Sequence, residues 1–389
     1  MTAMTFDTDG AHTDNVVEST AATVGEPTPL ATVRRDIVTA LLSTWLVGGV
    51  LADGWAHEHV KLESFITPWH AVLYAGFLAV AGWVGWLGLN TATPRPGARL
   101  PFVFPAGYSL AAIGALIFWL SGIADLAWHT AFGIERGDAA LLSPSHLGLL
   151  TGGVLLTTTP IRSAWHRHDG RDTLPFTALW CATLTTFTVS FLLHEDNAFW
   201  DNPISKGHRD AVRAATYPSS GYIQHIDLGA IVGSVIITTL VLFVPLIAIA
   251  TRWRLNVVTC VFVLGLPAVA IGGIKGFNDP GLALLSVIAA LLAGIAINVS
   301  TLLPLPRRRA IGISLGAATF WSTYVAGIAA ADHGLGVKAE IWAGLIVWPT
   351  LITLALALIT IDQPTSPAAN RRPPSHDTPA TRPHDGAAR

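Results

Sequence analysis

Two stretches of the chain combine aspartate and histidine at the same spacing. Asp53 is followed four residues later by His57, and Asp125 is followed four residues later by His129. Residues i and i+4 lie on one face of a helix, so each aspartate can point at the same spot as its histidine. Carboxylate oxygens and imidazole nitrogens are ligands of copper, zinc and iron. The spacing therefore indicates two incomplete metal sites.

A third ligand for each site comes from a tetrapeptide further along the chain. TPWH at 67–70 follows the first pair, and SPSH at 143–146 follows the second. Thr and Ser suit a helix N-cap and Pro suits the first helical position, so His70 and His146 fall in the first turn of a returning helix. An antiparallel hairpin brings that turn beside the end of the preceding helix. The predicted metal sites are Asp53, His57 and His70, and Asp125, His129 and His146.

Glu63 and Glu135 each lie six residues after the first histidine of their motif. Their carboxylates are predicted to accept a hydrogen bond from a metal-binding imidazole and so to fix its tautomer. The repeat is imperfect, because the two histidines are thirteen residues apart in the first motif and seventeen in the second. An isolated Asp/His pair is more often a hydrogen bond at a helix end. Two copies with shared offsets favour metal binding.

A weaker cluster of acidic and imidazole side chains follows later in the chain. It comprises His194, Asp196, His225 and Asp227. A long loop separates its two halves, so nothing in the spacing brings them together. A hydrogen-bonded cluster at the membrane interface is the favoured interpretation, and a third metal site is the alternative.

The elements that carry these motifs are long and apolar. Hydrophobic residues make up 51% of the 389 residues and charged residues 12%, against about 25% charged residues in a soluble domain. Apolar segments of about 20 residues recur, the length that crosses a bilayer as a helix. The predicted fold class is an all-α, polytopic integral membrane bundle of about ten transmembrane helices in five outward-facing hairpins. The predicted spans are 36–57, 67–90, 106–131, 144–162, 174–194, 222–250, 255–275, 281–302, 310–332 and 338–361.

Basic residues alternate between the segments that connect these spans. Sixteen of the 23 Lys and Arg residues fall at the two termini and in every second loop, and seven fall in the other loops. Basic loops face the cytoplasm. A multi-pass protein of the cell membrane is therefore predicted, with both termini cytoplasmic and with the metal sites near the outer face.

Composition also divides the chain. A disordered tail is predicted over 1–33, a four-helix region with both motifs over 34–165, six further transmembrane helices over 166–362 and a second disordered tail over 363–389. The net charge of −2 does not favour a nucleic-acid partner. Cys181 and Cys260 lie in apolar segments and are predicted to be buried thiols, outside any disulfide or metal site.

Both motifs give residues 36–165 a family resemblance. The region resembles the C subunit of the copper membrane monooxygenases, the family of particulate methane and ammonia monooxygenases. That subunit carries a triad spaced Asp-x3-His-x12-His, with Gly after the Asp and Thr-Pro before the last His. Asp53, Gly54, His57 and the segment 67–70 match it position for position. The family's second triad begins with Asn where this chain has Asp125, and the loop here is three residues longer.

The resemblance implies copper at both triads, whereas the ligand types alone also allow iron or zinc. It implies a copper-dependent monooxygenase, or a subunit of one, that activates O2 to oxidise a small apolar substrate arriving from the lipid bilayer. Other membrane subunits, or further copies of this chain, are the expected protein partners. Two alternatives stay open. One is a membrane transporter or metal-handling protein, and the other is a non-catalytic membrane subunit in which structural metals hold the hairpins together.

Overall fold

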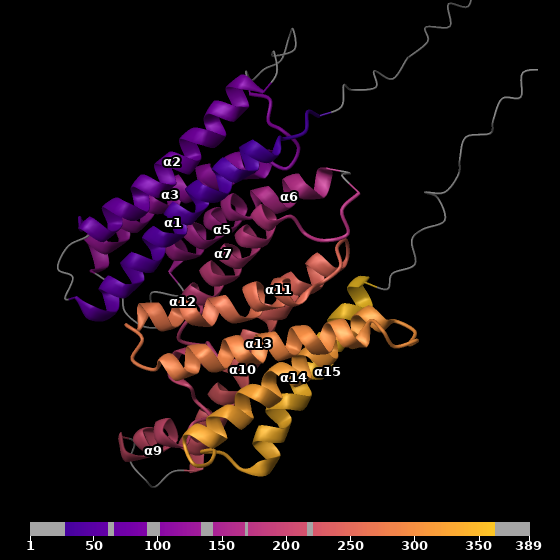
Figure 1. Ribbon diagram of the computed structural model, residues 1–389. Helices are drawn as coiled ribbons and strands as arrows, with labels where there is room; N and C mark the ends of the chain where they lie inside the picture. Colours follow the sequence, from indigo (N-terminus) through magenta and orange to yellow (C-terminus); the bar gives the residue numbers. More distant parts are fainter. Residues whose placement is uncertain are drawn as a thin grey trace, which may run out of the picture.

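Long helices make up most of the chain in the computed structural model (Figure 1). The structure describes residues 28–60, 66–91, 102–133, 143–167, 170–215 and 221–361, with the backbone alone at residues 201, 211–215 and 221–227. Eight segments within these ranges are long and apolar enough to cross a membrane as helices. The protein is thus a polytopic, all-α membrane bundle, which confirms the all-α, polytopic part of the predicted fold class.

The eight membrane segments include seven single helices and one composite helix. They are α1 (Val33–His59), α2 (Pro68–Asn90), α3 (Ser109–Phe132), α10 (Gly221–Ala250), the run from α11 (Val257–Cys260) through a π-helical turn (Val261–Gly265) to α12 (Leu266–Ile274), α13 (Pro280–Ser300), α14 (Arg308–Ala331) and α15 (Ala339–Ile361). The shorter helices are α5 (Pro144–Thr157), α6 (Thr159–His166), α7 (Phe176–Leu192), α8 (Ala198–Asp201) and α9 (Lys206–Ala215). All ten predicted segments coincide with helix to within a few residues.

Two of the predicted spans differ from a full membrane helix. The predicted span 144–162 is divided at Thr158 into α5 and α6. Pro160 follows the break, and its missing N–H cannot bond to the carbonyl four residues earlier. The predicted span 174–194 corresponds to α7, whose 17 residues cover about 26 Å at the rise of an α-helix. The uninterrupted helices here, α5 with 14 residues and α7 with 17, are shorter than each of the eight membrane segments.

Both helices that return with a histidine begin as their tetrapeptides predict. The Thr67 hydroxyl accepts a hydrogen bond from the His70 backbone N–H at 3.1 Å, and the Ser143 hydroxyl accepts one from the His146 N–H at 3.4 Å. A proline occupies the start of each helix. The caps therefore place each histidine in the first turn, where its side chain reaches back toward the preceding helix.

Glycines let the helices of each hairpin approach closely. A Cβ atom on Gly49 of α1 would lie 2.5 Å from the Leu73 Cα atom of α2, and one on Gly76 would lie 2.8 Å from the Leu46 backbone nitrogen. In the second hairpin, a Cβ atom on Gly152 of α5 would lie 2.7 Å from the α3 backbone. Small residues at such contacts are typical of membrane bundles, because close backbones increase van der Waals contact.

Replacing Gly76 with alanine is expected to destabilise the protein by about 1–3 kcal/mol, because the new methyl group meets backbone that cannot rotate away. The thermal unfolding midpoint in detergent should fall accordingly. Gly82→Ala is the matched control in the same helix, since a Cβ atom there would have nothing within 4 Å. Equal midpoints for the two variants would contradict this account of the α1–α2 contact.

A buried ionic network ties the start of α1 to the end of α6. Asp36 is fully buried, and its carboxylate accepts hydrogen bonds from the Tyr108 hydroxyl at 2.8 Å and the Ser163 hydroxyl at 3.1 Å. The Arg167 guanidinium forms an ion pair with the same carboxylate. Asp36 lies 17 residues before Asp53 on α1, or about 26 Å along a helix. The network and the first metal motif therefore occupy opposite ends of one helix.

Helix α7 joins the two parts of the core. A smaller apolar cluster is formed by α1, α2, α3 and α5, and a larger one extends from α7 through α15. Helix α7 contacts α1 and α5 on one side and α10 and α12 on the other, as its position in Figure 1 shows. The residues that follow α7 therefore lie near the hairpins α1–α2 and α3–α5.

Candidate metal centre

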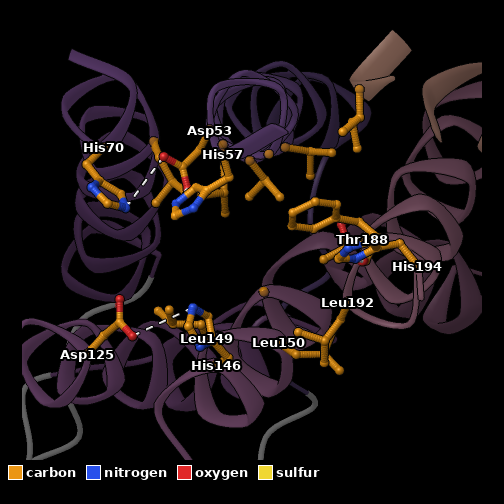
Figure 2. Close-up of a pocket in the computed structure, with 18 of the residues that line it drawn as sticks. Asp53, His57, His70, Asp125, His146, Leu149, Leu150, Thr188, Leu192 and His194 are labelled. Atoms are coloured by element: carbon orange, nitrogen blue, oxygen red, sulfur yellow. Dashed lines mark hydrogen bonds and ion pairs between the residues drawn. The ribbon is translucent and has the colours of Figure 1, made fainter. Parts of the chain in front are cut away.

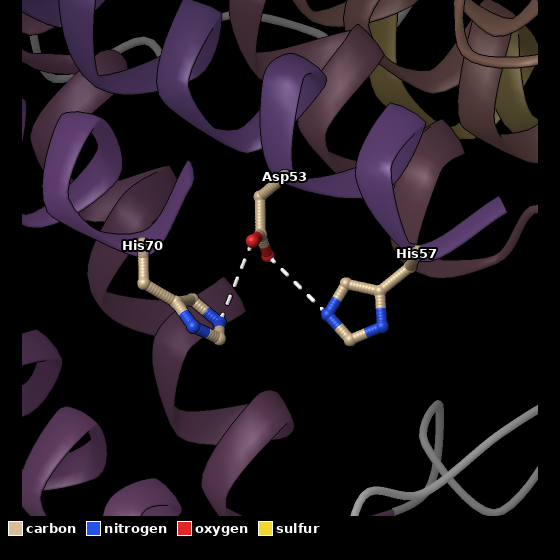
Figure 3. Close-up of side chains that lie close together, drawn as sticks. All are labelled: Asp53, His57 and His70. Atoms are coloured by element: carbon tan, nitrogen blue, oxygen red, sulfur yellow. Dashed lines mark ion pairs between the residues drawn. The ribbon is translucent and has the colours of Figure 1, made fainter. Parts of the chain in front are cut away.

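The first triad forms where α1 ends and α2 begins. Asp53 and His57 project from successive turns of α1, and His70 projects toward them from α2 (Figure 3). Asp53 Oδ2 lies 3.7 Å from His57 Nε2, and Asp53 Oδ1 lies 3.5 Å from His70 Nε2. Asp53 and His70 are largely buried, whereas a third of the His57 side chain is exposed.

The second triad repeats this arrangement with α3 and α5. Asp125 Oδ1 lies 3.5 Å from His129 Nε2 and 3.7 Å from His146 Nε2. The two imidazole rings are 5.9 Å apart at 71°, and those of the first triad are 6.1 Å apart at 69°. The imperfect sequence repeat therefore produces two sites of nearly equal geometry, despite the longer connection in the second hairpin.

The spacing of the nitrogen and oxygen atoms fits metal ligands. Two ligands about 2.1 Å from a tetrahedral metal lie about 3.4 Å apart. The observed separations of 3.5 to 3.7 Å are close to this value and long for direct hydrogen bonds. Within each triad, one donor atom per residue can be chosen so that all three lie within 4.8 Å of one another. Each triad could thus hold a metal ion.

The hydrogen bonds of the second triad orient its imidazoles for a cation. His129 Nδ1 lies 3.1 Å from the Gly133 carbonyl oxygen, which can only accept, so Nδ1 carries the hydrogen. In the neutral ring Nε2 is then an acceptor, and it faces the Asp125 carboxylate. Two acceptors in contact are unfavourable unless a proton or a metal ion lies between them. The Gly133 carbonyl thus orients the His129 ring, as the hydrogen-bond partners of metal-binding histidines commonly do.

In the first triad, Asp53 Oδ1 is a buried oxygen with no hydrogen-bond partner among the described residues. A buried acceptor without a partner lowers stability, and such atoms in native proteins often mark a bound ion or a functional role. This oxygen faces His70 Nε2. A cation between the two atoms would give this oxygen a partner.

Two serines of the second motif have roles that the sequence analysis missed. The Ser145 hydroxyl donates a hydrogen bond to Asp125 Oδ1 at 2.9 Å, and the Ser143 hydroxyl lies 2.6 Å from His146 Nδ1. Ser143 was predicted only as a helix cap. The serines on either side of Pro144 are the sequence pattern from which both hydrogen bonds could have been predicted. In the first motif, Trp69 stands in place of Ser145, so Asp53 has no equivalent donor there.

Ser145→Ala is expected to weaken metal binding at the second triad by about 10- to 100-fold, because Asp125 loses the hydroxyl that orients it. The helix cap is retained, since Ser143 is unchanged. The measurement is a competition titration with a metal chelator, made in a His70→Ala background so that the second triad is observed alone. Equal affinities with and without Ser145 would show that this hydrogen bond has no part in the site.

Both triads open into a single cavity of about 470 Å3 (Figure 2). Figure 2 shows Asp53, His70 and Asp125 on the left of the cavity and His194 on the right. Much of the wall is apolar, including Leu46, Leu73, Phe118, Leu149, Leu150 and Leu192. Thr188, Phe191 and Leu192 of α7 belong to this wall. Both sites were predicted to lie within residues 34–165, and the contribution of α7 to the cavity wall was not predicted.

The remaining predicted residues have different outcomes. Glu63 and Glu135 lie outside the described residues, so their role in orienting an imidazole stays a prediction. His59, which was not among the predicted ligands, lies near the first triad, but its Nδ1 donates to the Trp55 carbonyl at 2.9 Å and its ring stacks on Trp55. Cys181 and Cys260 are buried thiols, as predicted.

The structure describes only part of the weaker cluster. His194 Nε2 lies 3.5 Å from the carboxylate of Glu195, a residue outside the predicted set. Asp196, which belongs to that set, is exposed and lies outside the cavity wall. The side chains of His225 and Asp227 are not among those described, so their part in the cluster stays a prediction.

Comparison of the chain with protein-family models, with curated proteins and with solved structures found no match. The resemblance to the monooxygenase C subunit therefore depends on the two motifs alone.

Proposed function

We propose that the chain is a copper-binding membrane protein related to the C subunit of the copper membrane monooxygenases. In this proposal it activates O2 beside the triads and oxidises a small apolar substrate. The observation that carries the proposal is the opening of two matched triads into one cavity with a largely apolar wall. Apolar pockets with a few convergent polar groups are typical of small-molecule sites.

In this proposal the triads bind the metal, and the apolar residues of the cavity wall bind the substrate. Each triad offers two imidazoles and one carboxylate, a set that suits copper, iron and zinc, and copper is preferred because of the motifs. Bound copper would supply the redox chemistry that O2 activation needs. His59 is hydrogen-bonded to the Trp55 carbonyl and is not a fourth ligand. This supports an open coordination position on a metal at the first triad. Leu149, Leu150 and Phe118 would hold an apolar substrate and limit water beside the triads.

We further propose ten membrane spans in five hairpins, with α5–α6 and α7 crossing the membrane alongside the eight longer segments. Several arginines gather at the end opposite the triads, which supports this topology. Arg252 donates to the Arg167 carbonyl at 3.0 Å, and Arg309 donates to the Ala250 carbonyl at 3.4 Å. Because basic segments face the cytoplasm, both termini would be cytoplasmic and both triads would lie near the outer face.

A second candidate function is a non-catalytic membrane subunit in which the metals are structural. It is favoured by one observation, that each triad takes ligands from both helices of a hairpin. A metal bound there would hold the two helices of the hairpin together, and its binding free energy would stabilise the folded protein.

Isotope incorporation separates the two functions. Copper-loaded protein in lipid vesicles is supplied with a chemical reductant, 18O2 and propene. Oxidised product containing 18O is expected for the wild type and for His208→Ala, which removes a histidine outside the cavity wall. His57→Ala should abolish the product. Copper bound in stoichiometric amounts without any 18O product would overturn the catalytic proposal and favour the structural one.

A further inference from the structure

A third imidazole–carboxylate pair lies on the wall of the cavity, apart from the two triads. His194 and Glu195 follow the end of α7, and both line the cavity. The His194 Nε2 atom is 3.5 Å from Glu195 Oε1. That separation falls in the same range as the four Nε2–oxygen distances of the triads, where it matches the spacing of two ligands on one metal.

The His194 ring is held in one orientation. Its Nδ1 lies 2.7 Å from the Phe191 carbonyl oxygen, which can only accept, so Nδ1 carries the hydrogen and the neutral ring presents a lone pair at Nε2. One face stacks on the Phe191 ring, and the Trp200 ring lies edge-on at 4.4 Å. His129 of the second triad is oriented in the same way, by a hydrogen bond from its Nδ1 to a backbone carbonyl.

Glu195 is more open to solvent than the aspartates of the triads, whereas His194 is as buried as Asp53. Glu195 is 31% exposed at its side chain, against 15% for Asp53 and 4% for Asp125. Two exposed residues of α1, Glu58 and His59, line the same cavity. Carboxylates and imidazoles therefore line the cavity outside the triads as well. Acidic groups in such a cleft raise the local concentration of cations and their rate of entry.

We propose that His194 and Glu195 form an entry site, which captures a transition-metal cation from solution and supplies it to the triads. One imidazole and one carboxylate suit copper or zinc, with water completing the coordination. With two protein ligands against three, the entry site binds more weakly than a triad and exchanges its metal faster. The delivery step rests on the proposed function of the triads, whereas capture at His194 and Glu195 does not.

The test compares three versions of the full-length, metal-free protein in detergent, mixed with Cu2+ alone. The variants are His194→Gln/Glu195→Gln and the matched control Asp196→Asn, whose exposed carboxylate lies one residue further along and outside the cavity wall. The double variant is expected to take up copper about tenfold more slowly than the wild type, as expected for loss of an electrostatic guide. It should also lack the weakest bound equivalent in a titration followed by electron paramagnetic resonance. Asp196→Asn should match the wild type in both.

Uptake and stoichiometry unchanged in the double variant would overturn the entry site. Glu195→Gln alone, which conserves the side-chain shape, gives a second measurement if the double variant unfolds at a lower temperature. The triads are tested separately with His57→Ala/His70→Ala. If that variant keeps its full copper content while the His194 variant loses one equivalent, the proposed function fails and the entry site stands.

Discussion

Replacement of both His57 and His70 by alanine is expected to remove the copper of the first triad. The variant loses two of three ligands, and the loss of affinity should exceed the roughly 10- to 100-fold that follows from removing a group that only orients a ligand. The measurement is metal content by mass spectrometry, on detergent-purified protein loaded with copper and then desalted. The wild type should hold copper at both triads, and the variant should retain that of the second alone.

His59→Ala is the matched control for this loss. His59 lies two residues from His57 on α1, but its ring stacks on Trp55 and its Nδ1 donates to the Trp55 carbonyl. The control should therefore keep the copper content of the wild type. The reciprocal variant, His129→Ala/His146→Ala, should keep copper at the first triad. Metal-free wild-type protein after copper loading would refute the ligand assignment and return both triads to hydrogen bonding at helix ends.

Asp36→Ala is expected to have the largest effect on stability, about 3–5 kcal/mol, because Arg167 would be left as a buried charge without its carboxylate. The Tyr108 and Ser163 hydroxyls would also lose their acceptor. The loss should appear as a lower midpoint of thermal unfolding in detergent. Asp172→Ala removes an exposed carboxylate and should change stability by no more than about 0.5 kcal/mol.

A double-mutant cycle gives the sharper result for this network. Asp36→Ala/Arg167→Met removes both charges, so the double variant should be more stable than Asp36→Ala alone. If instead the two losses simply add, the ion pair does not account for the buried carboxylate. The metal content of the refolded or surviving protein should be unaffected, since the network and the triads lie at opposite ends of α1.

The sequence predicted the parts of the candidate site that follow local rules. The four-residue spacing of Asp53 and His57 requires helical geometry alone, and the cap at Thr67 places His70 in the next helix from a three-residue signal. The positions of the ten helical segments followed from apolar segment length for the same reason. Each of these inferences depends on residues that are close in sequence.

Two of the missing parts depend on contacts between distant residues. The bond from Ser145 to Asp125 spans 20 residues, and the ion pair between Arg167 and Asp36 spans 131. Pairing of His194 with its immediate neighbour was also missed. The helical rule that pairs residues four apart fails there, because α7 ends at Leu192 and the chain turns.

The long separation of Asp36 and Arg167 has a consequence for biogenesis. Asp36 is synthesised 131 residues before its counter-ion, so the first hairpin leaves the ribosome with an uncompensated carboxylate at the start of α1. An insertion intermediate that contains α1 and α2 alone cannot close this network. Closure has to await α6, when the second hairpin is complete. Folding of the two triad-bearing hairpins is thereby coupled, and a nascent chain stalled before residue 167 should leave Asp36 without its ion pair.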